Sequence, residues 1–465
     1  MSVTGFFRIS QPAVDKVPQD RARAEYRKFR NRTFWGVIAA YSLYYLCRMA
    51  LGVVKQPVID GGILTAAQLG LVGSALSFVY AIGKFTNGFM ADYCNIRRFM
   101  AVGLLVSSVL NLAMGALGLM HGAWGLTSGL LFVCFAICWG LNGWVQSMGS
   151  PPAVISLSRW FPLSRRGIFY SILCATPYVG KFASMVITGY VVVLIGWQYG
   201  FIFSAIGGVA GSVVVLLFVS DTPESKGLPS IQEISGEETK KTDGMPVGAL
   251  HRMVLGSPAI WIIALSSAFV YITQTGLSSW GVLFLQKSKG YSLTEAAWII
   301  GFSEAFGIAG TVLSGWLSDK VFRGDRLRPV LIGGLVSLFS MAAFLLTGGS
   351  TVLNIFYVAL FSLSMGMLYC IVSGLMALDI VPRKATGAAL GVVGISSYVA
   401  VGIQDIVSGF LIDGHAEGAD YNFLPVAAFW LSACLVSFLL PLLGWRKMKS
   451  RCYKSADVTS LKSTA

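Results

Sequence analysis

The sequence is poor in charged residues, and this shortage bounds its class. Asp, Glu, Lys and Arg make up only 12% of the 465 residues, whereas 55% are hydrophobic. A soluble domain usually carries about 25% charged residues. The composition therefore excludes an ordinary soluble protein and favours a chain that lies mostly within a lipid bilayer.

Histidines, paired cysteines and phosphate-binding loops are also scarce or absent. The chain has 3 His and 8 Cys, with no Cys-x-x-Cys pair. Cys134 and Cys138 lie four residues apart, a spacing more typical of apolar packing on one helix face than of metal binding. No Walker-type loop is present, so the sequence gives no support for ATP binding. We expect no metal, no cofactor and no catalytic nucleophile with its base, which predicts that the protein is not an enzyme.

Long apolar stretches recur along the whole chain, and each can cross a bilayer as a helix. They lack the alternation of apolar and polar residues that membrane β-strands show. The sequence therefore predicts an all-α membrane protein with twelve transmembrane helices. The expected spans are 34–54, 69–91, 99–120, 126–149, 167–192, 199–219, 259–284, 295–317, 328–347, 352–374, 385–412 and 422–444.

A polar segment at 221–257 divides the spans into two sets of six, and its composition is typical of a cytoplasmic linker. Residues 1–33 are polar and basic and contain no apolar stretch of the kind that a cleavable signal needs. The predicted organisation is an N-terminal segment, a six-helix bundle, the linker, a second six-helix bundle and a tail. Their expected ranges are 1–33, 34–220, 221–257, 258–445 and 446–465.

The net charge of +14 is distributed unevenly between the two sides of the predicted membrane. Of the 35 Lys and Arg residues, 29 fall on one side, and the other side receives only Lys287 and Lys289. Such an excess marks the cytoplasmic side, so both termini are expected in the cytoplasm. The basic charge thus indicates orientation in a bilayer, and we expect no nucleic-acid partner.

Three cations lie inside the predicted spans. A guanidinium within a membrane is costly, so Arg48 is expected to face a polar cavity or a partner, and its fixed charge suits an anion. The alternative is a buried structural ion pair. Lys84 could face the same cavity or anchor near the cytoplasmic gate. Lys181 could supply a second positive charge to the cavity, snorkel towards the surface, or pair with Glu304 or Asp405.

Two acids lie within the second set of spans. Glu304 is expected to be a charge partner for a base in the cavity rather than a ligand for an anion. Asp405 is costly in a membrane unless it has a basic partner or a proton. A structural ion pair and a proton-coupling role both remain open for it.

A short repeat links the two halves of the chain. Gly88-x-x-x-Asp92 follows the second span, and Gly315-x-x-x-Asp319 follows the eighth, with basic residues after each. These acids and bases can pair across a closing interface, and glycine permits close helix approach. The basic residues are Arg97 and Arg98 in the first half, and Arg323 and Arg326 in the second. A repeated turn in a chain of six plus six spans resembles the major facilitator superfamily, in which these turns hold the cytoplasmic gate.

Further motifs narrow the resemblance to one family of this superfamily. They are Tyr41-x-x-Tyr44-Tyr45-x-x-Arg48, Tyr80-x-x-x-Lys84, Met148-Gly149-x-Pro151-Pro152, Phe269-Val270-Tyr271, Glu304 with its Gly-rich followers, and Ala377-Leu378-Asp379-Ile380-Val381-Pro382. The set resembles the organophosphate:phosphate antiporters, which include bacterial glycerol-3-phosphate, hexose-phosphate and phosphoglycerate transporters and a related hexose-phosphate sensor.

The resemblance implies a site and also shows two departures from it. In the family, one arginine in span 1 and one in span 7 hold the phosphate; Arg48 matches the first, whereas Gln274 stands at the second position. The family histidine of span 5 is replaced within Thr176-Pro177-Tyr178, near Lys181. The resemblance also implies that six tyrosines line the translocation path, namely Tyr41, Tyr45, Tyr80, Tyr271, Tyr369 and Tyr398, and that Asp379 belongs to the gate charges.

The resemblance implies a secondary transporter that exchanges a phosphorylated organic anion for inorganic phosphate by alternating access of its two bundles. We expect a monomer in a bacterial inner membrane. Two alternatives are a membrane sensor of hexose phosphate that acts through a signalling partner, and a proton-coupled carrier of another organic anion or of a neutral solute.

Overall fold

The computed structural model describes residues 6–235, 252–322, 325–348, 350–380, 386–417 and 420–443. The chain divides into two compact units, Met1–Thr242 and Asp243–Ala465, each of which is considered by itself. Within the described residues almost all secondary structure is helical, and two strands of two residues each form a small antiparallel ladder.

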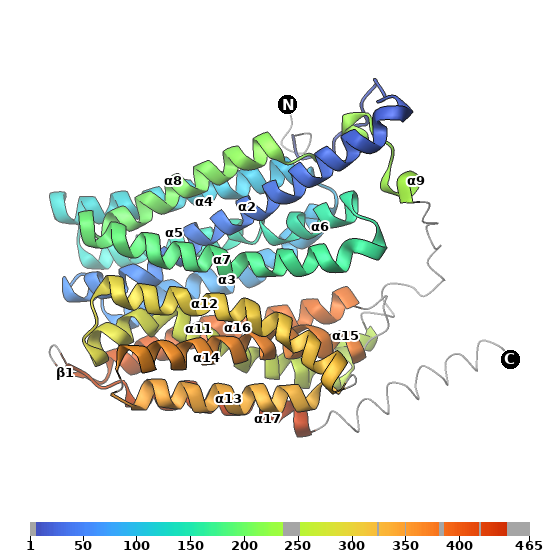
Figure 1. Cartoon of the computed structure of the whole chain (residues 1–465). Helices are drawn as coiled ribbons and strands as arrows, with labels where there is room; N and C mark the ends of the chain where they lie inside the picture. Colours follow the sequence, from blue (N-terminus) through green and yellow to red (C-terminus); the bar gives the residue numbers. More distant parts are fainter. Residues whose placement is uncertain are drawn as a thin grey trace. The chain divides into compact units, whose positions relative to one another are not determined.

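The N-terminal unit is built from seven long or medium helices. In Figure 1, α2, α4 and α8 lie side by side, and α3 packs against α5. The elements are α2 (Gln19–Asp60), α3 (Ala66–Asp92), α4 (Ile96–Trp124), α5 (Ser128–Gln146), α6 (Ser150–Trp160), α7 (Leu163–Ile195) and α8 (Trp197–Phe218), followed by η1 (Glu224–Lys226) and α9 (Ile231–Ser235).

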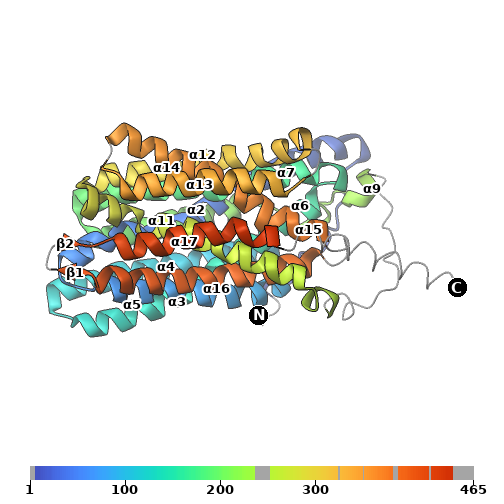
Figure 2. The same ribbon diagram turned by 90° about the horizontal axis from the view of Figure 1, so that it is seen from below.

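The C-terminal unit repeats this architecture with more irregular helices. Figure 2 shows α12, α13 and α14 running alongside one another. The elements are α11 (Pro258–Lys289), α12 (Leu293–Trp316), η2 (Leu317–Val321), α13 (Leu327–Leu346), α14 (Thr351–Cys370), η3 (Ile371–Leu375), α15 (Met376–Ile380), α16 (Thr386–Asp413), β1 (Ala416–Glu417), β2 (Asp420–Tyr421), α17 (Leu424–Leu439) and η5 (Leu440–Leu443).

The predicted membrane architecture is confirmed. In the part of the chain that the structure describes, twelve helical segments are long and apolar enough to span a bilayer. The first helix begins at Gln19, well before the predicted start of the span at residue 34. Hydropathy marks only the apolar part of a helix, whereas the polar residues 19–33 are rich in good helix formers that extend it.

Local sequence signals explain where several helices begin. Thr65 and Ser292 each form a capping box with the Gln or Glu three residues later, and these caps precede α3 and α12. Asn95 and Thr127 accept hydrogen bonds from backbone N–H groups in the first turns of α4 and α5. The starts of these spans are therefore fixed by short-range hydrogen bonds that the sequence encodes directly.

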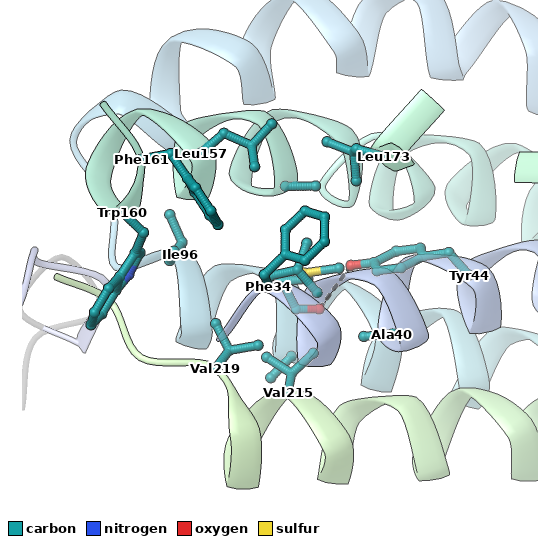
Figure 3. Close-up of a cluster of buried hydrophobic side chains, with 14 of the residues drawn as sticks. Phe34, Ala40, Tyr44, Ile96, Leu157, Trp160, Phe161, Leu173, Val215 and Val219 are labelled. Carbon is teal, nitrogen blue, oxygen red and sulfur yellow. Dashed lines mark hydrogen bonds between the residues drawn. The ribbon is translucent and has the colours of Figure 1, made fainter. Parts of the chain in front are cut away.

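An aromatic cluster closes one end of the N-terminal unit. Phe34, Trp160 and Phe161 pack there with residues of α4 and α8 (Figure 3). Tyr44 lies deeper in the same cluster, and its hydroxyl donates to the Met100 carbonyl oxygen at 2.7 Å. The cluster joins α2, α4, α6 and α8 at this end and thereby fixes the position of α2.

Glycines let corresponding helix pairs approach closely in the two units. A Cβ atom on Gly143 of α5 would lie 2.2 Å from the Leu76 carbonyl oxygen of α3. In the C-terminal unit, a Cβ on Gly310 of α12 would lie 1.8 Å from the Leu363 carbonyl oxygen of α14. Small residues commonly permit such contacts between membrane helices, which here hold α3 on α5 and α12 on α14.

Gly310→Ala should therefore destabilise the protein by about 1–3 kcal/mol, because the added methyl group would collide with backbone that cannot yield easily. Thermal unfolding of the purified protein in detergent measures the change. Gly391→Ala is the matched control, since a Cβ at this helical position of α16 meets nothing within 4 Å. Equal melting temperatures for the two variants would contradict the close-packing account.

Candidate functional site

Arg48 lies at the centre of an aromatic group in the N-terminal unit. Its guanidinium carbon is 4.3 Å from the ring centre of Tyr80 on α3 and 5.7 Å from that of Tyr45 on α2. The ring centre of Tyr41 lies 5.7 Å from that of Tyr45. A ring face attracts a cation, so the two tyrosine rings help to hold the guanidinium in place.

The two adjacent tyrosines of α2 have different environments. Tyr44 is fully buried and donates to the Met100 carbonyl oxygen, and a Cβ on Gly103 would meet its hydroxyl at 2.4 Å. Tyr45 instead packs against the ring of Tyr41 and beneath the guanidinium of Arg48. The structure thus separates an anchoring tyrosine from those that surround the cation.

Lys181 is brought close to this face by the contact between α7 and α2. A Cβ on Gly180 would lie 2.5 Å from the Ser42 carbonyl oxygen and 2.7 Å from the Tyr45 Cβ. The ammonium nitrogen of Lys181 lies 5.6 Å from the ring centre of Tyr178 on its own helix. The sequence placed Lys181 in span 5, and the structure adds that its backbone lies beside the Tyr45 segment.

Lys84 is half-buried on α3, one helical turn after Tyr80. The preceding residue, Gly83, packs on α5, where an added Cβ would lie 2.5 Å from the Ser147 hydroxyl oxygen. Lys84 therefore lies on the helix that carries the ring over Arg48, directly after a glycine that packs on α5.

Lys55 is a fourth intramembrane cation, which the sequence reasoning did not include among the site residues. Its side chain is 1% exposed, among the most buried large side chains of the chain. It lies on α2 seven residues after Arg48, so both project from the same face of that helix. This heptad spacing was the signal in the sequence that could have identified it.

Three of the expected tyrosines meet in the C-terminal unit. The Tyr271 hydroxyl of α11 donates to the Tyr369 hydroxyl of α14 at 2.9 Å, and their ring centres are 5.2 Å apart. The ring centre of Tyr398 on α16 lies 5.6 Å from that of Tyr271. Three helices thus contribute one tyrosine cluster, which presents hydroxyl groups rather than charge.

Three serines form a second polar cluster in the C-terminal unit, and two of them lie one helical turn from a tyrosine of the first cluster. The Ser267 hydroxyl donates to Ser373 at 2.6 Å and lies 2.8 Å from the Ser397 hydroxyl. Ser267 is one turn before Tyr271, and Ser373 is one turn after Tyr369. Ser373 falls in η3, a π-helical segment of a kind that is frequent at functional sites. The serines join the three helices that carry the tyrosines.

Gln274 lies on α11 between Tyr271 and Ser278, on the face that these three residues share. It is half-buried, and no residue in the described ranges hydrogen-bonds to its side-chain amide. The Ser278 hydroxyl donates to Glu304 of α12 at 3.1 Å, and Glu304 is 5% exposed. This face of α11 is therefore polar and neutral and ends beside a buried acid.

Asp405 is held by two donors from α11. The Ser279 hydroxyl and the Trp280 indole N–H donate to the same carboxylate oxygen, at 2.9 and 3.1 Å. Trp280 is fully buried, and Asp405 is 6% exposed. Both hydrogen bonds tie the carboxylate of α16 to α11.

The expected gate charges are placed only in part. The side chains of Asp92, Asp319 and Arg323 lie outside the described residues. Arg97 donates to the Leu216 carbonyl oxygen, and Arg98 donates to that of Phe6 at 2.7 Å. The hydrogen-bond acceptors observed for these two arginines are thus main-chain oxygens.

Two of the expected gate charges form an ion pair in the C-terminal unit. Arg326 Nε lies 2.9 Å from a carboxylate oxygen of Asp379 on α15. A second nitrogen of Arg326 donates to the Ser318 hydroxyl in η2 at 2.6 Å. Arg326 thus connects the start of α13 to both η2 and α15.

The N-terminal unit has an ion pair that the sequence reasoning missed. Arg159, at the end of α6, contacts the carboxylate of Asp221, which is 3% exposed. The same carboxylate accepts from the Ser10 N–H at 2.8 Å and the Ile96 N–H at 3.0 Å. Asp221 had been assigned to the linker, but the structure shows it packed in the unit. Asp221 comes directly after an apolar span, and this position in the sequence could have indicated that it is buried at the end of the bundle.

The described residues include no group of three or more His, Cys, Asp or Glu that could hold a metal ion. The groups described above in the two units carry cations, hydroxyls and amides, which can bind oxygen-rich anions and polar bodies.

Comparison with known proteins identifies the family. The sequence profile of the Major Facilitator Superfamily matches residues 37–404. The glycerol-3-phosphate transporter of Bacillus subtilis (strain 168) is 29% identical over 454 residues, which cover 94% of this chain and 97% of that protein. The probable hexose phosphate transport protein of Chlamydia pneumoniae is 29% identical over 412 residues, with 85% and 88% covered.

The chain belongs to the major facilitator superfamily, whose members are transporters rather than enzymes. Among its relatives are organophosphate transporters, which confirms the resemblance found in the sequence. A crystal structure of a bacterial homologue of the human lysosomal transporter Spinster, inward-facing and unoccupied, has a TM-score of 0.68 at 18% identity. It covers 93% of this chain and 98% of that chain, and it supports the fold.

Arg326→Gln should lower the thermal stability of the protein, because the side chain of Arg326 is only 13% exposed and the variant loses both its ion pair with Asp379 and its hydrogen bond to Ser318. The control is Arg328→Gln, whose pair with Asp325 is much more exposed and should contribute little. Thermal unfolding in detergent compares the two. A larger loss for Arg328→Gln than for Arg326→Gln would contradict this reading of the gate.

Proposed function

We propose that the protein is a secondary transporter of a phosphorylated organic anion, which it exchanges for inorganic phosphate. The observation that carries the proposal is Arg48, a permanent cation in a membrane-spanning helix, surrounded by Tyr45 and Tyr80. A guanidinium offers a planar set of N–H donors that matches the oxygens of a phosphate. The names of the relatives support a glycerol phosphate or sugar phosphate as the substrate.

The distribution of intramembrane charge supports a model in which the two units bind different parts of the substrate. Arg48, Lys84 and Lys181 lie in helices of the N-terminal unit, whereas α11 has no Lys or Arg between Pro258 and Gln286. We assign the phosphate group to the N-terminal cations. In our proposal, the hydroxyl-rich body of the substrate is bound by the tyrosine cluster of the C-terminal unit.

Gln274 fits this assignment because it adds a neutral hydrogen-bonding group to the C-terminal unit. A side-chain amide both donates and accepts, so it can hydrogen-bond to a hydroxyl or to a phosphate oxygen without adding charge. Its neighbours Tyr271 and Ser278 are also neutral hydrogen-bonding groups. The proposal therefore assigns Gln274 to substrate recognition, with Arg48 as the principal anion ligand and Lys181 or Lys84 completing the clamp.

Exchange follows from the electrostatics of such a site. Binding of an anion neutralises the cations and lowers the cost of moving the site between the two sides of the membrane. Without an anion, the uncompensated charge resists the movement, which couples entry of one anion to exit of another. We propose that the two halves rock to give alternating access, that the protein acts as a monomer in a bacterial inner membrane, and that both termini face the cytoplasm.

A second candidate, proton-coupled transport, is favoured by one observation. Asp405 is an acid buried in a membrane-spanning helix, and such residues commonly form proton pathways. Its carboxylate accepts hydrogen bonds from Ser279 and Trp280, and this fixed position instead fits a structural role. Transport with and without a pH gradient separates the two roles, and measurable flux also separates a carrier from a sensor.

Arg48→Lys should reduce phosphate exchange at least about 10-fold, because a point charge cannot reproduce two parallel hydrogen bonds and will not hold the same position over Tyr80. The measurement is exchange of labelled inorganic phosphate in proteoliposomes, with the amount of folded protein determined for each variant. Arg252→Lys is the control, since it changes the same residue type outside the spans. Near wild-type exchange in Arg48→Lys would overturn the assignment of Arg48.

Vesicles loaded with inorganic phosphate should take up labelled glycerol-3-phosphate faster than empty vesicles. Internal phosphate can bind the site after the substrate is released, and the neutralised site can then turn back to face the outside. A parallel experiment imposes a pH gradient on empty vesicles. Equal uptake by loaded and empty vesicles would reject exchange. Uptake driven by the pH gradient alone, and lost in Asp405→Asn, would establish the proton-coupled alternative.

A further inference from the structure

The main-chain oxygen of Cys47 receives unusual support from side chains. Asn111 Nδ2 of α4 and Asn142 Nδ2 of α5 each donate to it at 3.0 Å. In the continuous helix α2 this oxygen is also the expected acceptor for the N–H of Leu51. Both asparagines are fully buried. Two amides from separate helices therefore converge on a single carbonyl group of α2.

A second layer of hydrogen bonds orients these amides. The Ser107 hydroxyl donates to Asn142 Oδ1 at 2.6 Å, and Gln146 Nε2 donates to the Ser107 oxygen at 2.8 Å. Asn111 Nδ2 also donates to the Ser107 carbonyl oxygen at 3.0 Å. Donors thus run in one direction, from Gln146 through Ser107 and Asn142 to the carbonyl of Cys47. Such chains strengthen their members cooperatively in a medium of low polarity.

The position of this carbonyl connects the network to Arg48. The carbonyl oxygen of Cys47, its carbon, and the nitrogen and Cα of Arg48 lie in one peptide plane. Anchoring the oxygen therefore fixes the plane from which the Arg48 side chain departs. The thiol of Cys47 is also held, because it donates to the Ser204 carbonyl oxygen of α8 at 3.1 Å. The helix is thus fastened on the side facing α4, α5 and α8, while Arg48 lies over the rings of Tyr45 and Tyr80.

We infer that Asn111 and Asn142 are positioning residues for anion binding, which act by holding the Cys47–Arg48 peptide so that the guanidinium meets the phosphate in a fixed geometry. The inference rests on the proposed function, since it gives these amides a role only if Arg48 binds the anion. Long-chain cations lose binding strength when their backbone is free to shift, because bidentate hydrogen bonds tolerate little displacement.

Asparagines that merely stabilise helix packing would behave differently, and the chain offers a matched control. Asn87 of α3 is equally buried, and its amide donates to the Trp144 carbonyl oxygen at 3.0 Å and to the Ser147 hydroxyl at 2.6 Å. It joins α3 to α5 and makes no hydrogen bond to α2. Loss of the Asn87 amide removes a buried interaction of the same kind without releasing the peptide before Arg48.

The experiment measures exchange of labelled inorganic phosphate in proteoliposomes for Asn142→Leu, Asn111→Leu and Asn87→Leu, together with the melting temperature of each protein. All three should be less stable. Only Asn142→Leu and Asn111→Leu should raise the KM for phosphate, by about 10-fold or more, with a smaller effect on the maximal rate. Asn142→Ala, which removes the amide without adding bulk or charge, should behave like Asn142→Leu and carries the test if the leucine variants fold poorly.

The failures of the two proposals can be told apart. If Arg48→Lys leaves exchange intact, the proposed function fails and this inference fails with it. If Arg48→Lys abolishes exchange while the Asn111 and Asn142 variants keep the wild-type KM, only the positioning role is overturned. An increase in KM of the same size in Asn87→Leu would also overturn it, because the effect would then be a general consequence of lost packing.

Discussion

The structure of the N-terminal half depends on one constraint, which is that a permanent cation must be kept inside a membrane-spanning helix. Arg48 cannot lose its charge, so its cost must be offset by surrounding groups. The rings of Tyr45 and Tyr80 supply attraction on one side of α2. On the other side, the Asn111 and Asn142 amides of α4 and α5 donate to the Cys47 carbonyl oxygen, and the Cys47 thiol donates to a main-chain carbonyl oxygen of α8. A buried charge that needs so many surrounding groups is better explained by a role in binding an anion than by a contribution to the stability of the fold.

The interiors of the spans separate the two signs of charge between the halves. The cations Arg48, Lys55, Lys84 and Lys181 belong to the N-terminal unit, and the acids Glu304 and Asp405 belong to the C-terminal unit. The acids are held by donors from α11, which leaves the tyrosine cluster and Gln274 as the neutral polar groups of that unit. This separation gives each unit its own task in the proposed transporter, with anion binding in one and recognition of the uncharged body in the other.

Hydropathy predicted the spans, because the length and polarity of a span depend on local sequence. The family resemblance singled out Arg48 and six tyrosines, of which three meet in the C-terminal unit, and their roles stay predictions. Neither hydropathy nor the resemblance could predict that Asn111, Asn142 and Cys47 converge, since that contact joins residues 64 and 95 positions apart. Arg159 and Asp221 were missed for the same reason. Lys55 differs, because the sequence already shows that it lies seven residues after Arg48, and the structure adds only that its side chain is buried. Long-range hydrogen bonds between helices therefore account for most of what the sequence did not reveal.

The most direct test of the central claim is an experimental structure of the protein, in lipid nanodiscs, determined with and without saturating inorganic phosphate. The account predicts an anion whose oxygens lie about 3 Å from the guanidinium nitrogens of Arg48, with the Cys47 carbonyl still bound by Asn111 and Asn142. An anion bound elsewhere, with Arg48 paired to a protein carboxylate in both states, would contradict it.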